Sequence, residues 1–210
     1  MKILVACEES QAVCKAFRVK GHEAYSCDIV MCSGGRPEWH IWSDVRPLLN
    51  GGRSFRTCNG EDHYIDRWDM IIAFPPCTYL SKAGSSNLIK DGVMDFARFE
   101  KGLEAVKFFN NILSAKCGKI VIENPVPISL FGLPVPSQVI QPYYFGVPVS
   151  KMTYLWFKGD VPFLCPTNVV KPQYSFKTFP QFKNSNGKYR QRNRSKTFPE
   201  VAEAMALSWG

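Results

Sequence analysis

The chain has 210 residues, 45% of them hydrophobic, and a net charge of +8, so it can bury one substantial core and carries an excess of basic side chains. No internal repeat or shift in composition indicates a second domain, and we expect a single domain over residues 1–210. No apolar run approaches the roughly 20 residues of a bilayer span, and Met1 leads into a strand without a signal-peptide pattern. These features predict a soluble, cytoplasmic protein with no membrane partner and no obligate protein partner.

The first 28 residues predict a β-α-β unit. A strand over Lys2–Cys7 is followed by a turn at Glu8 and a helical stretch through Phe17. A second strand, Glu23–Asp28, ends in an acid. Asp28 lies about 20 residues after the first turn, the spacing at which such an acid meets ribose hydroxyls in nucleotide-binding α/β units.

A further apolar strand ends in two prolines and a cysteine. The run Asp69–Ala73 leads into Phe-Pro-Pro-Cys, and the consecutive prolines leave the backbone before Cys77 little freedom. A thiol held rigidly at the carboxyl edge of a sheet is suited to be a nucleophile. The alternative is that Cys77 is a small buried hydrophobic residue, the usual place of an intracellular cysteine.

Another short apolar strand, Lys119–Pro125, ends in a carboxylate and an amide, those of Glu123 and Asn124. Thiol and carboxyl can therefore converge at one edge of the sheet. Near the end of the chain, Pro199 is expected to open a terminal helix with Thr197 as its cap.

Positive charge is concentrated before that helix. Residues 161–199 contain no Asp or Glu, and their eight cations are Lys171, Lys177, Lys183, Lys188, Arg190, Arg192, Arg194 and Lys196. Five aromatic residues lie among them: Tyr174, Phe176, Phe179, Phe182 and Tyr189. This mixture favours a segment that holds phosphates and stacks on bases. The alternative is a solvated basic loop with its aromatic rings in the core.

The cysteines and histidines predict no metal site. The eight cysteines have no regular spacing and no Cys-x-x-Cys pair, which fits free thiols in a reducing compartment. The three histidines, His22, His40 and His63, show no ligand spacing.

Phe-Pro-Pro-Cys and, about 45 residues on, Glu-Asn-Pro resemble the catalytic motifs of the DNA cytosine-5 methyltransferases. The opening β-α-β unit, Gly-Val-Pro at residues 146–148 and the terminal helix occur in the linear order of that family and cover most of the chain. The resemblance implies an α/β, Rossmann-like class I methyltransferase fold with a mostly parallel central sheet and a very small recognition insertion. The chain is similar in size to compact, phage-type methyltransferase-like proteins, which act in an infected bacterial host.

The resemblance implies methylation of cytosine carbon 5 in DNA, with S-adenosylmethionine as the cofactor. Cys77 would add to carbon 6 of the ring, and Glu123 would hold ring nitrogen 3. Asn124 would fix the strand-end backbone. The family's Gln-x-Arg-x-Arg strand reads Val149, Lys151 and Thr153 at its three defining positions, so Lys151 is the cation that remains for the oxygen at position 2.

For the cofactor, the resemblance implies contacts from the first turn and from three later positions. Asp28 would hold the ribose and Asp44 the adenine amino group, although Asp44 fits a surface turn equally well. Cys7 and Glu8 would lie near the methionine end, in a turn that lacks the family's glycines, and Pro75 would complete the cofactor site.

The resemblance implies that the substrate is contacted by the loop after Cys77 and by the basic segment. The predicted substrate residues are Pro76, Ser81, Lys82, Lys188, Arg190, Arg192 and Arg194. The small residues of 81–86 are consistent with a mobile lid. Residues 158–190 form a reduced recognition segment, too short to read a long site. Duplex DNA, single-stranded DNA and a free cytosine nucleotide therefore stay open as substrates.

Two other functions fit the same residues. One is a catalytically silent relative that binds DNA or a nucleotide, which the glycine-poor first turn and the altered Gly-Val-Pro region would permit. The other is a different carbon-5 modification of a pyrimidine nucleotide with another one-carbon donor. Cofactor binding distinguishes the three.

Overall fold

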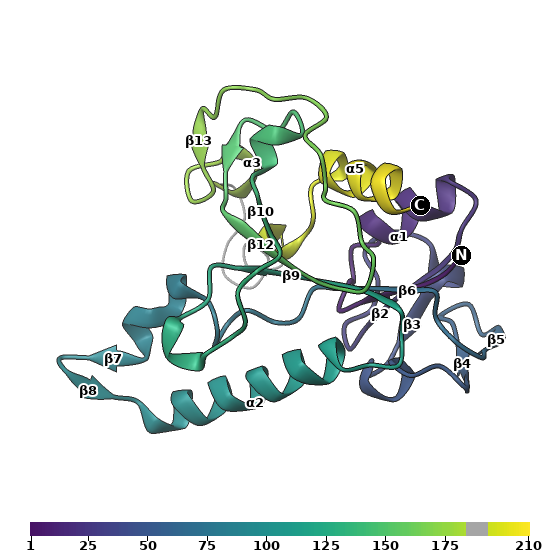
Figure 1. Cartoon of the computed structure of the whole chain (residues 1–210), viewed down its shortest axis with the longest axis horizontal. Helices are drawn as coiled ribbons and strands as arrows, with labels where there is room; N and C mark the ends of the chain where they lie inside the picture. The colour runs from purple at the N-terminus through teal and green to yellow at the C-terminus, as the bar shows by residue number, and fades with distance from the viewer. Residues whose placement is uncertain (184–192) are drawn as a thin grey trace.

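The computed structural model describes residues 1–183 and 193–210 (Figure 1). Its core is a seven-stranded sheet in the order β10-β12-β9-β6-β1-β2-β3. The strands are, in chain order, β1 (Lys2–Ala6), β2 (Glu23–Asp28), β3 (His40–Trp42), β6 (Met70–Ala73), β9 (Lys119–Pro125), β10 (Gln138–Ile140) and β12 (Thr153–Lys158). Neighbours pair in parallel except at β12, which is antiparallel to both β9 and β10. The predicted Rossmann-like α/β fold with a mostly parallel sheet is confirmed.

Helices cover both faces of this sheet (Figure 1). The helix α2 (Phe96–Leu113) lies along one face, and α1 (Ala12–Val19) and α5 (Pro199–Trp209) lie together on the other. Successive residues of β1 serve the two cores: Leu4 packs on the α2 side and Val5 on the α1 and α5 side. Burial on both faces explains why the strands read as continuous apolar runs. None of the helices in the described parts of the chain combines the length and apolar character that a bilayer span requires.

Smaller elements surround the sheet. The two-stranded sheets are β4 (Arg53–Arg56) with β5 (Asp62–Ile65), β7 (Ile89–Lys90) with β8 (Val93–Met94), and β11 (Val149–Ser150) with β13 (Tyr174–Ser175). The short helices are η1 (Pro37–Trp39), η2 (Arg46–Leu48), η3 (Lys82–Asn87), η4 (Ser129–Phe131), η5 (Pro142–Tyr144) and α3 (Pro180–Lys183).

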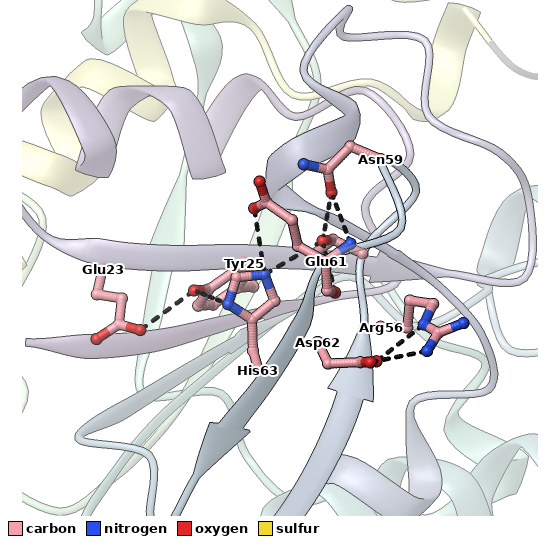
Figure 2. Close-up of polar contacts among 8 residues, drawn as sticks. Glu23, Tyr25, Arg56, Asn59, Glu61, Asp62 and His63 are labelled. Atoms are coloured by element: carbon pink, nitrogen blue, oxygen red, sulfur yellow. Dashed lines mark hydrogen bonds and ion pairs between the residues drawn. The ribbon is translucent and has the colours of Figure 1, made fainter.

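The β4–β5 hairpin is attached to β2 through Tyr25 (Figure 2). The Tyr25 hydroxyl donates to Glu23 at 3.2 Å and lies 3.1 Å from Nδ1 of His63. The other ring nitrogen of His63 lies 3.2 Å from the hydroxyl oxygen of Thr57. Both ring nitrogens of His63 therefore serve the packing of the hairpin.

The expected cap of the terminal helix is wrong by one residue. Pro199 does occupy the first turn of α5, but the cap is Phe198, and no side chain makes a capping hydrogen bond. The Phe198 carbonyl accepts the N–H groups of Val201 and Ala202. The Phe198 ring packs against the neighbouring apolar clusters, so hydrophobic contact sets the start of the helix in place of the Thr197 hydroxyl.

Gly102 allows the loops after β6 and β9 to pack against α2. A Cβ atom at Gly102 would overlap the ring of Phe131, in η4 beyond the end of β9. Phe131 in turn packs with Leu80 and Leu88, which follow β6. One helix therefore supports both loops that carry the predicted catalytic motifs.

We expect Gly102→Ala to lower the free energy of unfolding by about 1–3 kcal/mol through overpacking, although alanine is the better helix former by about 1 kcal/mol. Urea unfolding measures the change. Gly118→Ala is the control, since an added Cβ there meets nothing within 4 Å. A midpoint that stays constant or rises in Gly102→Ala would show that the Phe131 ring moves aside freely.

Candidate active site

The site lies at the carboxyl edge of the parallel strands, where open α/β sheets bind ligands. β6 ends at Ala73, directly before Phe-Pro-Pro-Cys. Its neighbour β9 carries Glu123 and Asn124 near its carboxyl end. The two strands pair in parallel, with Ala73 opposite Ile122. The predicted nucleophile and the predicted base-holding carboxylate therefore come from adjacent strands, as the sequence predicts.

The Cys77 thiol is partly buried in a tight loop. The Cys77 carbonyl accepts the N–H groups of Leu80 at 3.1 Å and Ser81 at 2.9 Å, which fixes the backbone around the thiol. Burial raises the pKa of Cys77, and the charge of Glu123 raises it further. The cations of Lys151 and Arg194 act in the opposite direction and favour the thiolate.

Glu123 and Lys151 form an ion pair beside this thiol. The Lys151 Nζ lies 3.9 Å from Glu123 Oε1, and the two side chains are 18% and 16% exposed. Burial raises the pKa of Glu123, and Lys151 partly offsets the rise. Cys77, Glu123 and Lys151 are called the Cys77 cluster below. It places a thiol near a carboxyl whose pKa is raised by burial.

Asn124 connects the carboxyl ends of β6 and β9. Its side chain is 1% exposed, and its amide Nδ2 donates to the Pro75 carbonyl at 3.0 Å. Its Oδ1 is buried without a hydrogen-bond partner in the described residues. Asn124 thus holds the Pro-Pro-Cys loop against β9 and keeps an acceptor available.

The half of the edge where the resemblance places the cofactor begins with a turn that lacks glycine but has a backbone conformation typical of glycine. Cys7 and Gln11 both have a φ of 59°, in the left-handed region that other residues enter rarely. Gln11 is held there by its side chain, which exchanges hydrogen bonds with the backbone of Arg36 at 2.8 and 3.0 Å. Cys7 lies at the end of β1, where the resemblance places the cofactor.

Glu8, predicted beside the cofactor, is turned toward α1. It is 4% exposed, and its carboxylate accepts the backbone N–H groups of Val13 at 2.7 Å and Cys14 at 3.1 Å. The cap residue Gln11 makes no side-chain capping bond, so Glu8 stabilises the start of the helix in its place. Burial raises the pKa of Glu8 to about 7 against the effect of these N–H groups.

The two predicted cofactor acids lie near the same turn. The negative charges of Asp28 and Asp44 both add to the effect of burial in raising the pKa of the Cys7 thiol. The Asp28 carboxylate accepts the N–H of Val30 at 2.8 Å, and burial raises its pKa. Asp44 is paired with Arg46, whose Nε contacts both carboxylate oxygens and lowers the Asp44 pKa. Asp44 therefore has the contacts of a surface turn, and Asp28 is the more available acid.

Two apolar side chains beside Asp28 are absent from the sequence prediction. Ile29 is 73% exposed and Trp42 is 59% exposed, and the Trp42 indole N–H donates to the Ile29 carbonyl at 2.9 Å. Large apolar side chains left in solvent next to an acid at a strand end are suited to cover a flat ring. The position of Ile29 directly after Asp28 is the signal that could have pointed to it.

Backbone contacts tie the loop after Cys77 to the segment that follows β9. Ser81 is 7% exposed and forms a bridge with Pro127, and the Lys82 N–H donates to the Val126 carbonyl at 2.8 Å. The helix η3 begins at Lys82. Of the predicted substrate residues in this loop, Pro76 and Lys82 are exposed and Ser81 is not.

The basic segment is only partly described. Lys188, Arg190 and Arg192 lie outside the described residues, as does Tyr189. The expectation that Phe179 stacks on bases is wrong, because its ring is 8% exposed in a cluster with Val147 and Val149. The short span after β12 needs an apolar centre of its own, and Phe179 supplies it.

Residues 193–198, called the C-terminal strap, contact both halves of the site. Arg194 lies over the ring of Phe176, with its Cζ 4.9 Å from the ring centroid. Two residues on, the Lys196 Nζ lies 3.9 Å from Glu9 Oε1 and donates to the Ser33 hydroxyl at 3.1 Å. Sequence reasoning identified the charges of this strap but not their contacts.

No model of a protein family matches the sequence, and no curated protein matches it. Among solved structures, the chain is similar to an E. coli prophage protein described as a candidate DNA modification methyltransferase, with 11% sequence identity and a TM-score of 0.47. The match covers 80% of this chain and 51% of the other, so this chain spans about half the length of that protein. The function is therefore inferred from the site itself.

The raised pKa of Glu8 gives a pH dependence that is opposite to that of a salt-bridged acid. The folded chain binds this proton up to about pH 7, whereas the ordinary pKa is 4.5. The stability that it contributes is complete below pH 4.5 and is lost as the pH rises through 7.

We expect the free energy of unfolding of the wild type to fall, relative to that of Glu8→Gln, between about pH 5 and pH 8, since glutamine does not titrate. Urea unfolding across this range measures it, with Glu100→Gln, an exposed acid on α2, as the control. Parallel pH profiles for the wild type and Glu8→Gln would contradict the assignment.

Proposed function

We propose that the protein methylates carbon 5 of cytosine in DNA, with S-adenosylmethionine as methyl donor and Cys77 as covalent nucleophile. The observation that carries the proposal is the Cys77 cluster, in which a thiol, a carboxyl and an ammonium group come together from three segments of the chain. This combination suits nucleophilic addition to a pyrimidine ring, and it stands next to an edge with the features of a nucleotide site.

The roles of the cluster follow from the chemistry of the ring. The Cys77 thiol releases its proton to solvent, and its sulfur forms a bond to carbon 6. Glu123 donates its proton to nitrogen 3, which takes up the electron pair displaced from the ring. The raised pKa of Glu123 favours the protonated form that this step needs. Lys151 stabilises the oxygen at position 2. After transfer, the proton on carbon 5 passes to water, the bond from carbon 6 to sulfur breaks and releases the thiolate, and nitrogen 3 returns its proton to Glu123, which restores the aromatic ring.

The residues of the edge fit the cofactor. The left-handed turn at Cys7 and Gln11 and the acid Asp28 suit the methionine end and the ribose, and the exposed Ile29 and Trp42 suit the adenine ring. Asp44 and Pro75 complete the set that we propose, with Asp44 available only if it exchanges its contact with Arg46. When bound, S-adenosylmethionine supplies the electrophilic methyl group.

We propose that the substrate is DNA and that the protein recognises at most a very short sequence in it. Residues 158–190 are the reduced recognition segment. In their described part, Phe179 packs inside the protein and is not free to contact DNA. In duplex DNA the target base has to leave the stack at a cost of a few kcal/mol, which favours single-stranded or easily opened targets. Pro76, Lys82 and the basic residues Lys188, Arg190 and Arg192 are proposed as contacts to the strand.

We expect Cys77→Ala to abolish transfer of labelled methyl from S-adenosylmethionine, and Glu123→Gln to slow it by about 10²–10⁴-fold, since glutamine cannot deliver a proton. Duplex DNA, single-stranded DNA and dCMP are offered in parallel. Cys58→Ala, at an exposed thiol away from the cluster, is the matched control and should keep full activity.

Transfer that survives in Cys77→Ala would refute the covalent mechanism. No transfer to any acceptor, together with no binding of cofactor, would favour the catalytically silent nucleic-acid binder, and binding of a different one-carbon donor would favour another carbon-5 modification.

We expect Asp28→Asn to weaken binding of S-adenosylmethionine about tenfold or more, because a charged acceptor for the ribose hydroxyls is lost. Isothermal titration calorimetry measures the affinity. Asp160→Asn, at an exposed position beyond β12, is the matched control. Equal affinities in the two variants would place the ribose elsewhere.

A further inference from the structure

Arg194 lies closer to the chemistry than its place in the basic segment predicts. Its guanidinium and the Lys151 ammonium each lie 4.9 Å from the centroid of the same ring, that of Phe176. The Lys151 ammonium reaches Glu123 at 3.9 Å. The Phe176 ring therefore makes cation–π contacts with both cations and holds Arg194 next to Lys151 of the Cys77 cluster.

One hydrogen-bond donor of the Arg194 guanidinium has no acceptor among the described residues. Its Nε is buried and has no hydrogen-bond partner among the described residues. An arginine buried only to hold the fold would be expected to satisfy this donor, since an unpaired buried donor costs about 1–3 kcal/mol. The Arg194 charge also reaches Cys77, where it acts with Lys151 against burial and Glu123.

We propose that Arg194 is a positioning residue that stabilises the negative charge on the Cys77 sulfur, supplying from the C-terminal strap a second cation that the Gly-Val-Pro region lacks. That region carries Lys151, with Val149 and Thr153 at the two positions where the resemblance leads us to expect polar side chains. Arg194 is attached through Phe176, and the positive charge of its guanidinium favours the thiolate. The inference deepens the proposed function and concerns the reactivity of Cys77 before any substrate binds.

The test is alkylation of Cys77 by iodoacetamide in the full chain, without cofactor or DNA. The thiolate displaces iodide and forms a carbon–sulfur bond, and its proton goes to the buffer, so the rate follows the thiolate fraction. Labelling of the Cys77 peptide is measured by mass spectrometry across a pH series, with the exposed Cys58 as internal reference. Because the assay needs no methyl donor, its result does not depend on whether the protein transfers methyl groups.

At pH 7 we expect Arg194→Gln to slow Cys77 labelling by about three- to tenfold, and Arg194→Lys to stay within about twofold of wild type. The difference between Arg194→Gln and wild type should vanish at high pH, where every Cys77 is ionised. Arg53→Gln, at an exposed arginine on β4, is the matched control and should change nothing.

Three results would overturn the proposal. They are equal labelling in Arg194→Gln and wild type at pH 7, a difference that is constant across the pH series, and a loss in Arg194→Lys as large as in Arg194→Gln. The last two would show that Arg194 controls packing or access to the thiol. Urea unfolding of each variant confirms that it is folded during labelling.

Discussion

The parallel pairing of β6 with β9 is the constraint on which the site depends. It brings the chain segments after Ala73 and Ile122 to neighbouring points about 4.8 Å apart. Pro75 and Pro76 have no backbone N–H, so at these two positions the backbone of the loop that carries Cys77 can be held only through its carbonyl groups. The Asn124 amide binds the Pro75 carbonyl and thereby makes the second strand the support of the first strand's loop.

Burial then sets the electrostatic character of the Cys77 cluster. It raises the pKa of both Cys77 and Glu123. Lys151 opposes the rise at both groups, and Arg194 opposes it at Cys77. A Cys77 thiolate and a Glu123 carboxylate side by side in this environment would repel each other. The two cations lower the free-energy cost of forming a negative charge there. The two cations therefore favour the development of negative charge on the Cys77 thiol.

The sequence predicts the parts of this structure that depend on local pattern. Glu23–Asp28 and Lys119–Pro125 form strands with the predicted bounds, because each is an apolar run bounded by residues that end a strand. The proximity of Cys77 and Glu123 follows from the order of the motifs in a parallel sheet, whereas Lys151 lies near Glu123 because it lies just before β12, which is antiparallel to β9. Their catalytic roles stay predictions.

What the sequence could not predict depends on contacts between distant residues. Glu8 serves α1 because Gln11 is occupied with the Arg36 backbone, which no local pattern reveals. Phe179 is buried because the short segment after β12 must build its own apolar cluster. Arg194 carries the same signature in the sequence as its basic neighbours, and only the position of Phe176 distinguishes it.

The C-terminal strap has a consequence for how the two halves of the edge behave together. Arg194 contacts the side where the base would react, and Lys196, only two residues away, contacts Glu9 and Ser33 on the side of the methyl donor. Two residues of extended chain span at most about 7 Å, so neither contact can shift far without pulling on the other. The side proposed for the methyl donor and the side proposed for the base are therefore linked through a part of the chain that belongs to neither strand end.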